Sequence, residues 1–124
     1  MGLSFQLVPD NVNTSTAIWF LTNLHYHFGR PLVVVWDRWS VHRSAARHIR
    51  TRHRRWFDFE WLPAYAPELN PVECTWNHTK YATLANFIPD DLQDLSHEVQ
   101  HSMKRQAQDQ QLLRSHFDYA ELQL

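Results

Sequence analysis

The sequence is poor in cysteine, and this excludes several kinds of small protein. Its 124 residues include a single cysteine, Cys74, so an internal disulfide framework and most cysteine-based zinc sites are excluded. No apolar run approaches the roughly 20 residues that a membrane-spanning helix needs. Residues 1–10 lack the charged and apolar regions of a signal peptide. We therefore expect a soluble, cytoplasmic protein with no membrane partner.

Internal repeats, low-complexity segments and long linkers are absent as well. The chain is long enough for one modest globular domain, over residues 1–124, and too short for two. Its hydrophobic share of 44% and aromatic share of 14% exclude a disordered or collagen-like chain, because side chains of this kind supply a core.

Charge is distributed unevenly, although the formal net charge is only -1. Between residues 38 and 55 there is no acidic residue but a block of seven arginines: Arg38, Arg43, Arg47, Arg50, Arg52, Arg54 and Arg55. Residues 90–124 instead hold seven acidic residues against three basic ones. One basic and one acidic face are therefore expected. The arginine block is typical of a surface that contacts phosphates, although solvated helix faces also produce runs of charge.

The first half of the chain predicts the order strand, helix, strand, helix, strand. Residues 2–8 form a β-type run closed by turn formers. Apolar residues then recur at helical spacing from Thr14 or Ser15 until Gly29. Residues 31–37 are a nearly continuous β-branched run, which is typical of a strand covered on both faces.

The next two elements carry the arginine block and an aromatic strand. Val41, Ala45 and Ile49 follow each other at a spacing of four, which predicts a helix whose other sides carry arginines. Residues 56–62 alternate aromatic and acidic side chains, which predicts a strand with one exposed face.

Two further helices are predicted in the second half. Asn70 is a good N-cap and is followed by proline, the residue best suited to the first helical position. We expect this helix to run to about Phe87. Pro89, with two aspartates after it, opens a last, acidic helix that extends beyond Met103.

Two carboxylates occupy positions, a strand end and a helix start, at which α/β proteins commonly place functional sites. Asp37 ends the apolar strand, and Glu73 lies in the first turn of a helix two elements later. Together they are suited to Mg²⁺, which takes one or two carboxylates plus waters and phosphate oxygens. The alternative is that Asp37 only caps the next helix and that Glu73 only stabilises the helix dipole.

Two blocks of this sequence resemble a known family. They are VVVWDRWSVH and, after the arginine-bearing helix, LPAYAPELNPVECTWNHTK. The second block, which holds Glu73, Trp76 and Lys80, is the more specific one. Together they resemble the C-terminal part of the catalytic domain of DDE-superfamily transposases, in the bacterial insertion-sequence group related to mariner elements. The resemblance covers residues 3–88.

This resemblance implies a fold and an activity. The fold is a truncated RNase H-like α/β fold, with a mixed sheet of about three strands and flanking helices. The activity is cleavage of DNA at transposon ends and transfer of the 3′ end to a target, with three carboxylates around two Mg²⁺ or Mn²⁺ ions. Asp37 matches the second acid and Glu73 the third, so both are expected to bind metal and act in catalysis.

The chain departs from the family pattern in three ways. No residue matches the first acid, and Asp10 replaces it poorly because it lies among turn formers. The N-terminal helix-turn-helix domain of such proteins has no counterpart. Arg38 stands where relatives commonly carry asparagine, so a cation beside Asp37 is expected to compete with metal or to reach toward phosphate. We expect this chain alone to be inactive.

Other residues are expected near the site or on DNA. His42 matches a histidine often seen in the family and is expected beside Asp37, or solvated on its helix, and Asn70 is also expected near the site. Arg43, Arg47 and Arg50 form one stripe on their helix that would follow a DNA backbone. The expected DNA-binding set is Arg38, Arg43, Arg47, Arg50 and Lys80.

For the remaining candidates, which are histidines, tryptophans and Cys74, structural roles are expected. The histidine pairs lack a convincing third metal ligand. Trp56, Trp61 and Trp76 are expected in the core, with stacking on an extruded base as the alternative for one of them. Cys74 is expected to pack rather than to act as a nucleophile.

Three other interpretations stay open. In the first, the chain is a non-catalytic remnant that binds DNA or associates with a transposase, as a homo-oligomer or with an upstream transposase half. In the second, it is the downstream half of a split gene. In the third, it is an RNase H-like repair or RNA nuclease, an interpretation that the second sequence block does not support.

Overall fold

The computed structural model describes residues 1–120, which divide into two compact units. The sheet unit is Val8–Ala66. The helical unit consists of Met1–Leu7 and the residues from Pro67 onward. The expectation of a single domain over residues 1–124 stays a prediction. No helix of the described chain is long and apolar enough to cross a membrane.

The first helix of the sheet unit is α1 (Thr14–Phe28), and both of its ends lie close to the predicted ones. Asn13 is its N-cap, because its side chain accepts a hydrogen bond from the Thr16 backbone while the Thr16 hydroxyl accepts one from the Asn13 N–H. Gly29 ends the helix with a φ of 61°, a left-handed conformation that glycine adopts without a steric penalty.

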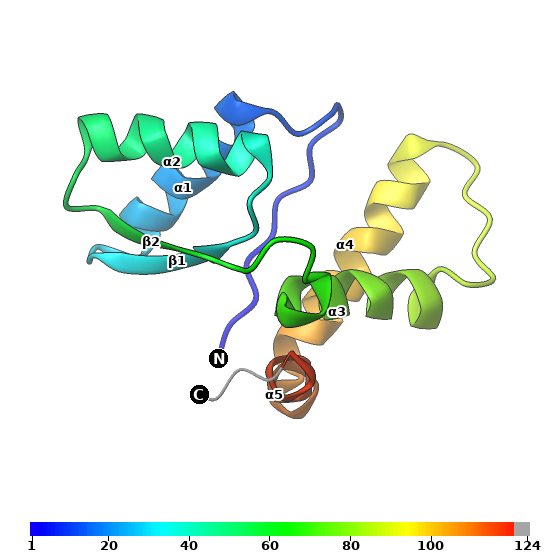
Figure 1. Cartoon of the computed structure of the whole chain (residues 1–124). Coiled ribbons are helices and arrows are strands. Elements are labelled where there is room, and N and C mark those ends of the chain that lie inside the picture. The colour runs from blue at the N-terminus through cyan, green and yellow to red at the C-terminus, as the bar shows by residue number, and fades with distance from the viewer. Residues whose placement is uncertain (121–124) are drawn as a thin grey trace. The chain divides into compact units, whose positions relative to one another are not determined.

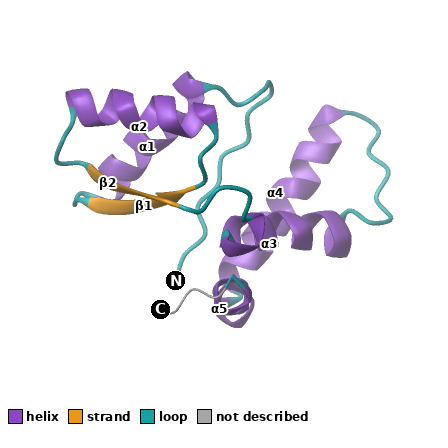
Figure 2. Ribbon diagram, in the orientation of Figure 1, coloured by secondary structure: helices purple, strands orange, loops and turns teal. Residues whose placement is uncertain are grey.

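Two parallel strands and a crossover helix complete the sheet unit. Strand β1 (Leu32–Trp36) pairs in parallel with β2 (Phe57–Trp61), and helix α2 (Ser40–Arg52) connects them. Both α1 and α2 lie on one face of this sheet (Figures 1 and 2). The core between helices and sheet consists of Leu21, Ala46, Ile49, Phe57 and Phe59.

The sheet corrects three predictions. Residues 2–8 form no strand, because a strand needs a hydrogen-bonded neighbour and none of the described residues pairs with this segment. The described sheet therefore has two strands, both parallel, instead of about three in a mixed sheet. The expectation that residues 31–37 are covered on both faces is also wrong. Val33 is 64% exposed and Val35 is 51% exposed, because the helices of this unit cover only the other face.

The described residues of the helical unit form three α-helices. Helix α3 (Pro71–His78) continues into the π-helical segment η2 (Thr79–Thr83), and a 3₁₀ turn, η1 (Pro67–Leu69), precedes it. The predicted end near Phe87 is thus too late. The predicted last helix is split into two, α4 (Leu92–Gln108) and α5 (Gln110–Tyr119).

The split at residue 109 has a local cause. The Asp109 side chain accepts a hydrogen bond from the Leu112 backbone N–H, which caps α5 and starts a new helix. The chain thereby has five α-helices among its described residues rather than the four predicted.

The helical unit has a partly polar core. Met103 and Leu113 are buried, and so are five polar side chains: Thr75, Thr79, Ser102, Gln106 and His116. The hydroxyls of Thr79 and Thr83 each lie 3.0 Å from that of Ser102, which ties η2 to α4. Since burying unpaired polar groups is costly, these hydrogen bonds stabilise the packing of the helices.

Candidate functional site

Asp37 lies directly after β1, and two groups hold one oxygen of its carboxylate. The backbone N–H of Trp39 donates to Oδ1 over 3.0 Å, and His42 Nδ1 donates to the same oxygen over 2.7 Å. The Asp37 side chain remains 47% exposed. Among the described residues no group donates to Oδ2, so this oxygen keeps its lone pairs for a cation.

His42 is itself oriented by aromatic neighbours. The Trp36 ring stacks on the imidazole with centroids 4.3 Å apart, and the Trp39 ring meets it edge-on at 5.2 Å. The expectation that His42 lies beside Asp37 is therefore confirmed. The alternative that Asp37 caps α2 is wrong, because the N-cap residue is Trp39 and no side chain caps this helix.

Glu73 lies in the helical unit, in the first turn of α3, where its side chain is half-buried. The Asn70 side chain accepts a hydrogen bond from the Val72 N–H over 3.2 Å, and Pro71 occupies the first helical position. The predicted helix start is thus confirmed. Glu73 thus lies near the N-terminal end of α3, where the helix dipole presents its positive end.

The donor chemistry of these residues fits a hard divalent cation. Mg²⁺ and Mn²⁺ prefer oxygen ligands, and Mg²⁺ is usually held by one or two carboxylates together with waters and substrate phosphates. Asp37 offers an oriented carboxylate with one oxygen unused. Within residues 1–120, no group of three or more His, Cys, Asp or Glu side chains is assembled for a metal ion.

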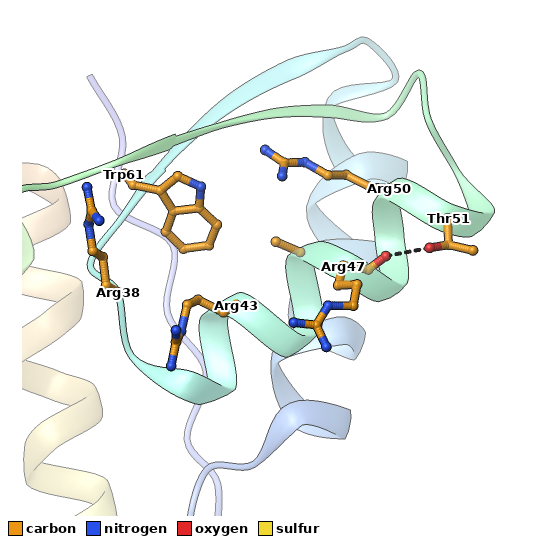
Figure 3. Close-up of a pocket in the computed structure, with 7 residues that line it drawn as sticks. Arg38, Arg43, Arg47, Arg50, Thr51 and Trp61 are labelled. Atoms are coloured by element: carbon orange, nitrogen blue, oxygen red, sulfur yellow. Dashed lines mark hydrogen bonds between the residues drawn. The ribbon is translucent and has the colours of Figure 1, made fainter.

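The arginines predicted to bind DNA gather around a hollow at the edge of the sheet unit (Figure 3). The hollow has a volume of about 440 Å³ and lies between α2 and the end of β2. Its polar and aromatic lining consists of Arg38, Arg43, Arg47, Arg50, Thr51 and Trp61. We call it the arginine hollow. Bringing four guanidinium groups together produces a strongly positive surface that suits an anion.

Two of these arginines are anchored by the protein and two are free of such contacts. Arg38 Nε donates to the Leu62 carbonyl over 3.2 Å, so Arg38 turns to β2 and forms no ion pair with Asp37. Arg50 donates to the Phe59 carbonyl and lies 5.3 Å over the Phe59 ring. The exposed Arg43 and Arg47 side chains have no hydrogen-bond partner in the described part of the chain.

Comparison with known families adds a decisive observation. The family model described as "DDE superfamily endonuclease" matches residues 1–96 of this chain. The chain belongs to the DDE superfamily of endonucleases. A search of curated proteins finds no match, and a search of solved structures finds none either.

The matched region of this superfamily member contains every candidate site residue. Asp37 and Glu73 lie inside it, as do the arginines of the hollow, whereas α5 lies outside it. Lys80 also falls inside the match, but it is an exposed residue of η2 in the helical unit and is not part of the arginine hollow.

The three tryptophans that were expected in the core of this superfamily member lie in three different environments. Trp56 is sandwiched between His25 and His53, with ring centroids 3.9 and 3.7 Å away. Trp76 is 39% exposed, so its expected place in the core is wrong. Trp61 lines the arginine hollow. Sequence reasoning did not connect Trp61 with the arginines, although it ends the alternating strand on the face that α2 covers.

Cys74 has the character of a packed thiol rather than a nucleophile. Burial raises its pKa above the ordinary value of 9.0, and the neighbouring Glu73 carboxylate raises this pKa further. Because the thiolate is the reactive form, both effects make Cys74 less reactive at neutral pH.

Proposed function

We propose that this protein supplies part of the catalytic domain of a DNA transposase, in which Asp37 and Glu73 hold Mg²⁺ or Mn²⁺. The observation that carries the proposal is the oriented Asp37 carboxylate, held through one oxygen by Trp39 and His42, in a chain of the DDE superfamily. Such ions activate the attacking oxygen and stabilise the leaving oxygen during displacement at phosphorus. His42 acts here as a positioning residue for Asp37.

The finer assignment is to the bacterial insertion-sequence transposases related to mariner elements. The run from Leu62 to Lys80 supports it, because the aromatic, the prolines and the Asn70–Pro71 helix start precede the acid in the order that the family resemblance implies. In this assignment the DNA is a transposon end or its target, and the arginine hollow contacts its phosphates.

We further propose that the sheet unit is part of an RNase H-like domain that further strands complete. A two-stranded parallel sheet is small, and no described strand pairs with the second edge of β1 or of β2. The missing first acid would arrive with such strands, from another segment or another chain such as an upstream transposase half. On this proposal, residues 1–124 alone do not cut DNA.

A second candidate function is DNA binding without cleavage, by a chain that associates with a transposase or with a second copy of itself. Two observations favour it: no group of three or more His, Cys, Asp or Glu side chains is assembled among the described residues, and the four arginines of the hollow do not need a metal to bind phosphate. The two candidates differ in whether Asp37 and Glu73 bind a cation.

The test is a calorimetric titration of the purified chain with Mn²⁺. Asp37→Asn and Glu73→Gln should each remove or strongly weaken binding, because each removes a carboxylate but keeps the shape of the side chain. The matched controls are Asp58→Asn, an exposed acid of β2, and Glu68→Gln in η1. Unchanged Mn²⁺ binding in both Asp37→Asn and Glu73→Gln would contradict the proposed metal site and favour the non-catalytic candidate.

Supercoiled plasmid DNA with Mn²⁺ gives the second readout. Wild-type chain alone should bind the plasmid without nicking it. Nicking that disappears in Asp37→Asn and Glu73→Gln would show that these two carboxylates suffice, or that another residue of this chain acts as third ligand, and the proposed need for a further acid would then be wrong.

A further inference from the structure

The arginine hollow contains an aromatic surface that phosphate binding alone does not require. The indole of Trp61 is half-exposed between the side chains of Arg38 and Arg50, with Arg43 on the helix opposite (Figure 3). The Phe59 ring lies beside it on the same face of β2, with ring centroids 6.4 Å apart and planes inclined by only 19°, which helps to fix the orientation of the indole. A fixed aromatic face amid guanidinium groups suits a flat, anionic ligand.

The arginines divide into fixed and available cations. Arg38 and Arg50 are held at the β2 side by the carbonyls of Leu62 and Phe59. Arg43 and Arg47 are one helical turn apart on the exposed side of α2, a rise of about 6 Å along the helix axis. This rise is comparable with the spacing of neighbouring phosphates along an extended nucleic-acid strand. No acidic side chain lines the hollow.

The volume of the hollow, about 440 Å³, is in the range of sites that hold a small organic molecule and is ample for one nucleotide. In a DNA duplex the faces of the bases are stacked on each other, so only an unpaired nucleotide can offer a base to Trp61. Stacking of a base on an aromatic side chain is a common source of affinity for single strands and tolerates any base.

We infer that the arginine hollow binds an unpaired DNA nucleotide, with its base on Trp61 and its two flanking phosphates at Arg43 and Arg47. The inference rests on the proposed function, because it takes DNA as the ligand, and it adds that this surface selects single-stranded over double-stranded DNA. Such a site would hold a DNA strand that is separated from its partner strand.

The test measures binding of the full chain to a labelled 12-nucleotide single strand and to a duplex of the same length, by fluorescence anisotropy without metal. Trp61→Leu removes the aromatic face but keeps apolar bulk, and should weaken single-strand binding roughly tenfold. Trp61→Phe keeps an aromatic ring and should retain most of the affinity. Neither change should alter duplex binding. Trp19→Leu, at an exposed tryptophan of α1, is the matched control and should have no effect.

A second pair of variants tests the phosphate contacts. Arg43→Gln with Arg47→Gln should reduce the slope of log affinity against log salt by about 1.4 for the single strand, since each phosphate contact contributes about 0.7. Arg54→Gln with Arg55→Gln removes the same charge from exposed residues that do not line the hollow, and should change this slope less.

Three results would overturn the inference. They are equal or tighter binding of the duplex by wild type, unchanged single-strand affinity in Trp61→Leu, and displacement of the single strand by polyglutamate as effective as that by unlabelled oligonucleotide. Circular dichroism shows whether a variant has failed to fold. If Trp61→Leu does not fold, Trp61→Phe replaces it in the comparison of single-strand with duplex binding. A merely structural role of Trp61 does not predict any discrimination between single and double strands.

The two proposals fail separately. The Mn²⁺ titration contains no DNA and the single-strand titration contains no metal, and neither Asp37 nor Glu73 lines the hollow. If Mn²⁺ binding does not depend on Asp37 and Glu73, the single-strand proposal is unaffected. If the chain shows no preference for single strands, the proposed metal site is unaffected.

Discussion

The imidazole of His42 donates a hydrogen bond of 2.7 Å to the carboxylate of Asp37, five residues earlier in the chain. The connection links the end of β1 to the first turn of α2, and the Trp36 ring stacks on the imidazole. Because the Trp39 backbone also donates to this oxygen, the carboxylate is held at one side and open at the other. A hydrogen-bonded partner of this kind fixes the orientation of a metal ligand.

Replacing His42 should weaken metal binding without removing it. His42→Phe keeps a ring for Trp36 to stack on but cannot donate to Asp37, so we expect Mn²⁺ affinity to fall roughly 10- to 100-fold in a calorimetric titration. His48→Phe on the same helix is the control, because His48 has no hydrogen bond to Asp37. An unchanged affinity in His42→Phe would mean that the Asp37–His42 contact serves folding alone.

The amide of Gln106 connects three helical segments of the helical unit. It is 2% exposed, and its Nε2 donates to the Thr75 carbonyl and to the Thr79 hydroxyl. Gln106→Leu leaves these two groups without their donor, so we expect the free energy of unfolding to fall by about 2 kcal/mol. Urea denaturation measures the loss. Gln108→Leu, at an exposed position of the same helix, should change stability little, and equal losses in both variants would contradict this role.

His116 makes the helical unit less stable in acid. Burial lowers its pKa below the ordinary value of 6.5, and the nearby His78 lowers it further. The fold therefore favours the neutral imidazole, whose Nε2 lies 3.3 Å from the Gln106 Oε1. The unfolded chain binds the proton more readily, so this contribution to stability is fully present above about pH 6.5 and is lost as the pH falls through the folded pKa.

Urea midpoints between pH 8 and pH 5 test this dependence. His116→Gln should show a smaller decrease of stability over this range than wild type, because the titrating group is gone. His101→Gln, at an exposed histidine of α4, should keep the wild-type decrease. The assignment to His116 fails if both variants follow the wild-type profile.

Two asparagines of α3 should differ in their contribution to stability, because Asn70 caps the helix and Asn77 lies inside it. Asn70→Ala removes the side chain that accepts from the Val72 N–H, and should reduce the free energy of unfolding by about 1 kcal/mol. Asn77→Ala lies inside the same helix, where alanine is the better helix former, and should leave stability equal or slightly higher. Thermal unfolding of both variants checks the prediction, and destabilisation by Asn77→Ala of the same size would contradict the cap.

Local signals explain why much of the sheet unit could be predicted. The left-handed Gly29, the β-branched run of β1 and the alternation in β2 each determine their element within a few residues. The Asn70–Pro71 helix start is a local signal of the same kind. Asp37 and Glu73 could be selected as candidates because they lie at these element boundaries, directly after β1 and in the first turn of α3.

Other features depend on partners distant in the sequence, and these were missed. Residues 2–8 have the composition of a strand, but a strand exists only where a neighbour accepts its hydrogen bonds. Val33 and Val35 were expected to be covered, yet covering a second face requires a second layer, and neither helix of the sheet unit supplies it. Predictions of this type fail because apolar composition indicates which side chains tend to be buried without indicating what is available to bury them.

The sequence by itself determined the helices α1 and α2, the two strands, the start of α3 and the two acids expected to bind metal, because each depends on neighbours within a turn or on alternation along one strand. Only the tertiary structure decided which of the two positions expected for His42, beside Asp37 or in solvent, is adopted. It also decided that Arg38 turns away from Asp37 to Leu62, and that Trp61 meets the arginines of α2. The crossover from β1 through α2 to β2 brings these residues together, and packing against a shared core determines which side chains face each other.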